Sequence, residues 1–74
     1  MMQAVAVVLS ELAAVPADPA APLDLDSLTM VQLVEALEAR FGFLARASEL
    51  TSENLGSLAA LSAWVARRTL PAPP

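Results

Sequence analysis

Apolar side chains recur every three or four residues in three segments of the 74-residue chain, which is the spacing that places them on one side of an α-helix. The first segment, residues 3–14, ends before Pro16, which cannot continue a helix. The second, residues 27–41, is the clearest and is followed by Gly42, a residue type that often ends helices. The third, residues 57–68, begins with a serine that can cap it. The pattern therefore predicts three longer helices.

The segments between these helices differ in length and content. Residues 15–26 contain three prolines and predict a loop, in which Leu23 and Leu25 are expected to pack against the helices. A fourth, short helix is expected around residues 53–55, after Thr51 or Ser52 as its cap. The prediction is an all-α fold, a small antiparallel four-helix bundle of three longer helices and one short helix, with a long first loop.

The bundle is expected to form one domain over residues 1–70. Residues 71–74 are expected to be a disordered, proline-rich tail. No internal repeat suggests a second domain.

Two faces of the predicted helix over residues 27–41 differ in character. One stripe, about 100° wide, is apolar and is expected to face the core: Met30, Leu33, Val34, Leu37 and Phe41. A neighbouring face surrounds Ser27 with two apolar and two acidic residues: Leu28, Val31, Glu35 and Glu38. Because the core stripe is already complete, the apolar pair on this second face is expected to make contacts with other molecules.

The composition excludes several classes of function. The chain has no cysteine and no histidine, so it lacks the usual thiol nucleophile, general base and zinc ligands. Its net charge of -4, from eight acidic residues and four arginines, is unfavourable for binding nucleic acid or an anionic membrane and favours basic partners. No segment approaches the ~18 apolar residues of a membrane span, and the first residues lack the positive charge of a secretion signal. A cytoplasmic location is expected.

Ser27 is open to more than one interpretation. A serine after an aspartate at a helix start is very often only a cap, although Met30 stands where a capping box would have Glu or Gln. A calcium loop over "DLDSLT" is rejected, because Leu28 and Thr29 occupy positions that need an oxygen ligand and a glycine. A serine hydrolase is rejected because no base could activate the hydroxyl.

The run "LDLDSLTMVQLVEALEARFGF", residues 23–43, resembles the attachment site of acyl carrier and peptidyl carrier proteins, in which Asp-Ser-Leu opens the second helix of a four-helix bundle. The later run "LTSENLGSLAALSAWV" is similar to the third and fourth helices of that family in order and length. The first helix and loop match the family least well. Asp-Ser-Leu alone is a weak signal. Together with the length of the chain and the order of its helices, it becomes a strong one.

The resemblance implies that Ser27, flanked by Asp26 and Leu28, receives a covalent 4'-phosphopantetheine from coenzyme A through a separate phosphopantetheinyl transferase and Mg²⁺. The arm would hold acyl or aminoacyl groups as thioesters, and the protein itself would be a monomeric carrier and not an enzyme. Basic partners would be steered by Asp24, Asp26, Glu35 and Glu38, with Leu28 and Val31 in apolar contact. The implied partners are loading and biosynthetic enzymes, such as acyl- or aminoacyl-activating enzymes, ketosynthase or condensation domains, and a thioesterase.

The acidic charge on the predicted second helix is thinner than in carriers of fatty-acid synthesis. The outward positions that are often acidic in those carriers are here occupied by Thr29, Gln32, Ala39 and Arg40. Together with the proline-rich first loop, this favours a stand-alone carrier of polyketide or nonribosomal peptide biosynthesis. The alternatives are a fatty-acid-synthesis carrier, or an unmodified helical adaptor or scaffold that binds a partner through Leu28 and Val31.

Overall fold

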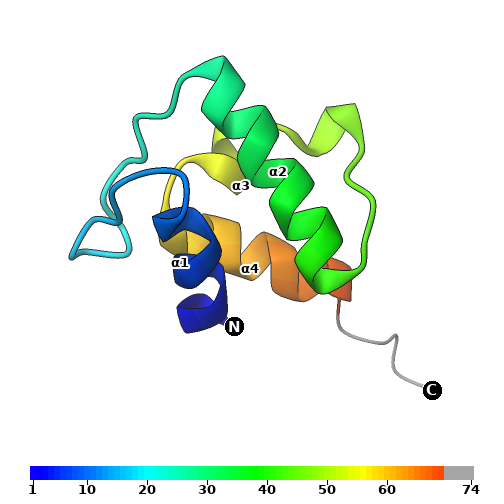
Figure 1. The fold of residues 1–74 in the computed structure, drawn as a ribbon, viewed down its shortest axis with the longest axis horizontal. Coiled ribbons are helices and arrows are strands. Elements are labelled where there is room, and N and C mark those ends of the chain that lie inside the picture. The colour runs from blue at the N-terminus through cyan, green and yellow to red at the C-terminus, as the bar shows by residue number, and fades with distance from the viewer. Residues whose placement is uncertain (70–74) are drawn as a thin grey trace.

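The structure is a computed structural model that describes residues 1–69, and in these residues helices are joined by loops without a β-strand. The elements in chain order are α1 (Met2–Ser10), α2 (Ser27–Phe41), the 3-10 helix η1 (Ala47–Glu49), α3 (Ser52–Leu55) and α4 (Leu58–Thr69). Helix α4 packs against α1, α2 and α3 (Figure 1). The predicted all-α bundle of three longer helices and one short helix is confirmed.

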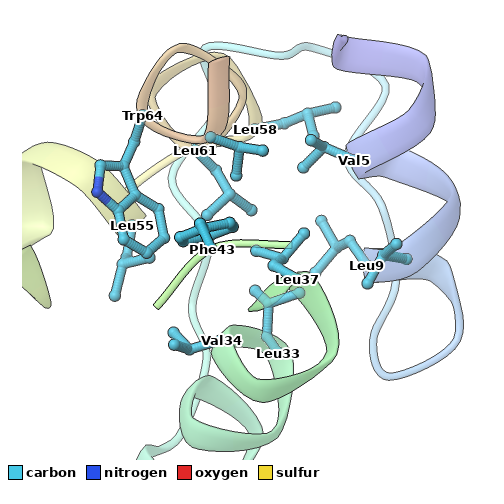
Figure 2. Close-up of a cluster of buried hydrophobic side chains, with 12 residues drawn as sticks. Val5, Leu9, Leu33, Val34, Leu37, Phe43, Leu55, Leu58, Leu61 and Trp64 are labelled. Atoms are coloured by element: carbon cyan, nitrogen blue, oxygen red, sulfur yellow. The ribbon is translucent and has the colours of Figure 1, made fainter. Parts of the chain in front are cut away.

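One apolar core joins the helices (Figure 2). The Trp64 indole, 1% exposed, is the largest fully buried side chain, and the Phe43 ring meets it edge-on with centroids 5.4 Å apart. The other buried apolar residues come from every α-helix: Val5, Val8, Leu9, Leu33, Val34, Leu37, Leu55, Leu58, Leu61 and Val65. From the predicted core stripe of α2, three residues are buried, and Met30 and Phe41 pack against the core half-buried. Because the chain has no cysteine, this packing is what stabilises the fold.

Helix α1 is shorter than the predicted helix over residues 3–14, because it ends at Ser10. The Ser10 hydroxyl donates to Val7 O at 2.6 Å, a side-chain bond that competes with the backbone ladder. Glu11 N then donates to Val8 O at 3.2 Å and Leu12 N to Leu9 O at 2.9 Å, so three-residue steps enter the ladder where the helix ends. The prediction was therefore too long by about one turn.

The loop between α1 and α2 is attached to the start of α4. Leu23 N donates to Gly56 O at 2.8 Å, and Ala59 N donates to Pro19 O at 2.9 Å. The side chains of Leu23 and Leu25 are half-buried against the core, which confirms their prediction. The chain is thus fixed just before α2 begins.

Gly42 and Ser57 act at helix ends as predicted. Gly42 ends α2 in the left-handed conformation, with φ of 75°, and its N–H donates to Glu38 O. Ser57 Oγ accepts a hydrogen bond from Ala60 N at 3.1 Å, so it caps α4. Thr51 holds the N-cap position of α3 without a capping bond from its side chain.

The 3-10 helix η1 was not predicted, and it is held by one glutamate. Glu49 Oε2 accepts from Trp64 Nε1 at 3.0 Å and pairs with Arg68 Nε at 3.1 Å, while Oε1 accepts from Arg46 N at 2.9 Å. Asn54 Nδ2 donates to Glu49 O at 2.7 Å. The Arg46 N–H, the Trp64 N–H and the Arg68 charge hold the pKa of Glu49 below its ordinary value. Glu49 therefore joins η1, α3 and α4.

The predicted boundary at residue 70 and the predicted disordered tail, residues 71–74, lie outside the described residues. No helix in residues 1–69 is long and apolar enough to span a bilayer.

Candidate functional site

The start of α2 is capped by Asp26 and not by Ser27. Asp26 is extended, with φ of -74° and ψ of 169°, and its Oδ1 accepts a hydrogen bond from Thr29 N at 2.7 Å. Its carbonyl accepts from Met30 N at 2.9 Å. The interpretation of Ser27 as the cap is therefore wrong, and Ser27 is the first residue of the helix. Aspartate is itself a preferred N-cap residue, so Asp26 was a signal for this in the sequence.

The Ser27 side chain is exposed, and its hydroxyl makes no hydrogen bond to another group among residues 1–69. No pocket is present in the part of the chain that the structure describes, so the hydroxyl lies on an open surface. The cap on Asp26 and the pinned loop before it fix the backbone of Ser27. The hydroxyl is thus held in a defined place and is accessible to another protein.

The backbone at this helix end favours a negative group. The N–H groups of Ser27 and Leu28 have no acceptor in residues 1–69, since Asp26 engages only those of Thr29 and Met30. Free N–H groups at the start of a helix carry partial positive charge, which stabilises a phosphate ester placed there. The Thr29 hydroxyl and N–H beside Asp26 lower the pKa of its carboxyl, so Asp26 remains an acceptor for the cap.

The predicted contact residues lie on the same face as Ser27. The side chain of Leu28 is 67% exposed and that of Val31 is 49% exposed, although both are apolar. Glu35 is exposed one turn beyond Val31, and Asp24 is exposed in the loop before the helix. In Figure 1 the start of α2 lies at the edge of the molecule, away from the end of α4. The site residues thus form one exposed strip.

Glu38 differs from the other predicted residues because its carboxylate is used inside the protein. It is half-buried, and its Oε2 accepts a hydrogen bond from Ala45 N at 2.7 Å. This bond attaches the segment after α2 to the last turns of that helix. No local pattern indicates this bond, because Ala45 lies seven residues beyond Glu38, past the turn at Gly42.

No group of three or more acidic side chains in residues 1–69 is placed to hold a metal ion. The fold and the site together define a class: a small helical bundle with an exposed, unengaged hydroxyl at the start of a long helix. A profile of the family described as "phosphopantetheine attachment site" matches residues 2–65. The chain therefore belongs to this family, and the resemblance to acyl and peptidyl carrier proteins is confirmed. Searches of curated proteins and of solved structures found no match.

Membership of the family has direct consequences. The protein carries a covalently attached 4'-phosphopantetheine, and it is a carrier and not an enzyme. It interacts with a phosphopantetheinyl transferase and with biosynthetic enzymes. The exposed hydroxyl and the free N–H groups at the start of α2 fit the phosphodiester of such a group.

Proposed function

We propose that Ser27 is the attachment residue and that the protein is a carrier of acyl or aminoacyl intermediates. The observation that supports this most is the unengaged, exposed hydroxyl at the first residue of α2, in the run Asp26-Ser27-Leu28. The three other exposed serines lack these features. Ser10 donates its hydroxyl to Val7 O, Ser48 lies inside the three-residue helix η1, and Ser52 begins a helix of only four residues.

The chemistry of attachment needs a nucleophilic oxygen from this chain. Ser27 Oγ forms a bond to the phosphorus that bears the pantetheine of coenzyme A. The phosphoanhydride bond breaks, adenosine 3',5'-bisphosphate leaves, and the serine proton passes to a base of the transferase or to water. When bound, the group supplies the thiol that the cysteine-free chain lacks, as a site for thioesters.

The residues around Ser27 have different roles in binding. The N–H groups of Ser27 and Leu28 stabilise the negative charge of the phosphodiester. Asp24 and Glu35, which have no basic partner in residues 1–69, attract basic surfaces of the enzymes. Leu28 and Val31 supply apolar contact, and Glu38 adds negative charge beside them while it also holds Ala45.

The pathway that we propose is polyketide or nonribosomal peptide biosynthesis in the cytoplasm. The support is the thin acidic charge on α2, where Thr29, Gln32 and Ala39 stand at positions that are often acidic in fatty-acid carriers. Arg40, at a further such position, pairs with Glu11 at 3.5 Å. A carrier of fatty-acid synthesis and an unmodified adaptor are the alternatives.

The intact mass after incubation with coenzyme A, Mg²⁺ and a broad-specificity phosphopantetheinyl transferase tests the proposal. We expect one phosphopantetheine on the parent protein and on a Ser52→Ala control, and none on Ser27→Ala. Circular dichroism should show that Ser27→Ala folds normally, since Asp26 keeps the cap. An adduct on Ser27→Ala, or none on the parent with several active transferases, would refute the assignment and favour the adaptor.

A further inference from the structure

Among residues 1–69, Leu44, in the turn after α2, is the most exposed of the large apolar side chains, at 78%. Arg68 Nη2 donates to Leu44 O, Arg67 precedes Arg68 on α4, and Arg46 follows Leu44 by two residues. The backbone N–H of Arg46 donates to Glu49, Asn54 donates to Glu49 O, and Arg67 donates to Asn54. We call Leu44, Arg46, Arg67 and Arg68 the basic surface.

Two members of the basic surface, Leu44 and Arg68, are held in place by the core beneath them. Phe43, the neighbour of Leu44, is buried against Trp64, so the backbone fixes Leu44 on the outside. The Arg68 guanidinium stands over the Phe43 ring, 5.9 Å from its centroid, and pairs with Glu49. The exposure of Leu44 is therefore a feature of the packed fold.

The charge of the basic surface is not fully neutralised within the described residues. Glu49 is already engaged by Arg68, by Trp64 and by Arg46 N. The Arg46 guanidinium makes no hydrogen bond or ion pair in residues 1–69, and that of Arg67 bonds only to the neutral Asn54. A position at the end of α4 accounts for Arg67 and Arg68 through the helix dipole, but it does not account for Arg46.

The opposite charge prevails around Ser27. No arginine or lysine occurs in the first 39 residues, and the exposed acids there include Asp18, Asp24 and Glu35. The molecule thus has an acidic part before Arg40 and a basic surface beyond it. Two surfaces of opposite sign fit two different partners.

We propose that the basic surface binds an acidic segment of a partner protein, with an apolar side chain of that segment against Leu44. A protein segment is favoured over a nucleic acid because the chain as a whole carries a charge of -4, which repels a long polyanion. The single rigid leucine also offers an apolar contact that a phosphate backbone cannot use. The surface is separate from Ser27, so a protein bound here leaves the serine accessible.

The test uses the ¹⁵N-labelled protein and a synthetic amphipathic helix of leucine and glutamate. We expect amide shifts at Leu44, Arg46 and the end of α4, and a dissociation constant that rises about threefold in Arg46→Ala and about tenfold in Leu44→Ser/Arg46→Ala. Arg40→Ala is the matched control, because it removes an exposed arginine outside the basic surface and should change the constant by less than about twofold. A leucine and lysine helix should shift residues near Ser27 instead.

Several results would overturn the proposal. They are the absence of shifts at the basic surface, equal effects of Arg40→Ala and Arg46→Ala, and equal binding of the lysine helix at Leu44. Self-association in sedimentation that Arg46→Ala abolishes would assign the surface to a second copy of the chain instead. The mass gain at Ser27 should be unchanged in Leu44→Ser/Arg46→Ala, so failure here is distinguishable from failure of the attachment proposal.

Discussion

Asp26 and Ser27 are adjacent, and they have separate tasks. The carboxylate of Asp26 satisfies the Thr29 N–H, which leaves the hydroxyl of Ser27 without a structural role. A serine that capped the helix itself would have its oxygen engaged and would be a poorer nucleophile. The same separation occurs further along α2, where Glu35 is free and Glu38 holds Ala45.

Replacing Glu38 by alanine should affect stability, whereas replacing Glu35 by alanine should affect binding of the transferase. We expect Glu38→Ala to lower the free energy of unfolding by about 1 kcal/mol, because it leaves Ala45 N without its acceptor. Glu35→Ala should leave stability within about 0.5 kcal/mol of the parent, because Glu35 makes no contact of this kind. It should instead reduce kcat/KM of the transferase about threefold at low salt.

Urea unfolding and transferase kinetics at two salt concentrations measure these effects. Equal loss of stability in the two variants would contradict the assignment of Glu38. A kcat/KM for Glu35→Ala that matches the parent at low salt would contradict the docking role of Glu35.

At the scale of elements, the helix ends and the loop contacts determine where Ser27 lies. The loop before α2 is bonded to Gly56 O and to the start of α4, so α2 begins at a fixed place relative to α4. The two glycines of the chain act in different ways. Gly42 has a positive φ and open space around it, whereas Gly56 has an ordinary φ of -77° but no room for a side chain.

Replacing each glycine by alanine distinguishes the two reasons for a glycine, which are the left-handed backbone at Gly42 and the lack of space at Gly56. A Cβ at Gly56 would overlap Ser52 O, so Gly56→Ala must shift the turn between α3 and α4 and should cost about 2 kcal/mol. A Cβ at Gly42 meets nothing within 4 Å, so Gly42→Ala should cost only about 1 kcal/mol for the left-handed conformation.

Thermal and urea unfolding of both variants provide the measurement. A Gly56→Ala variant as stable as the parent would contradict the close packing of the α3–α4 turn. The amide of Leu23, which donates to Gly56 O, should lose hydrogen-exchange protection in Gly56→Ala and keep it in Gly42→Ala.

At the scale of the whole molecule, packing around Trp64 and the Glu49 contacts join the parts of the fold. Glu49 touches Arg46, Trp64 and Arg68 and thereby joins η1 to α4. Because Arg68 also holds Leu44, the same contacts build the basic surface. The same core therefore positions both Ser27 and the basic surface.

Stability should depend on pH through Glu49. Its pKa is lowered by folding from 4.5, so its contribution is fully present above that value and is lost as the pH falls through the lower folded pKa. We expect the free energy of unfolding of the parent to fall more steeply below about pH 4.5 than that of Glu49→Gln, which cannot titrate. Urea unfolding across this range is the measurement, and parallel curves would contradict the assignment.

The sequence by itself determined the class of fold, the bounds of α2 and the serine at its start. These follow from local causes: apolar spacing, the stop at Gly42, and the run Asp26-Ser27-Leu28, which also carries the family resemblance. The predicted first helix was too long, since a side-chain bond at Ser10 accompanies its end, and of the interpretations of Ser27 the cap was wrong, since Asp26 is the cap.

Only the tertiary structure decided which charged side chains are engaged within the protein and which remain available to partners. Glu38, Glu49 and Arg68 are ordinary charged residues in the sequence, and their contacts bring together segments that no periodicity relates. The basic surface depends on Arg68 of α4 meeting the turn at Leu44, over 20 residues away in sequence, and on Arg67 meeting Asn54 of α3. Such contacts depend on how the helices pack, because local spacing fixes which face of a helix is apolar but not what lies opposite that face.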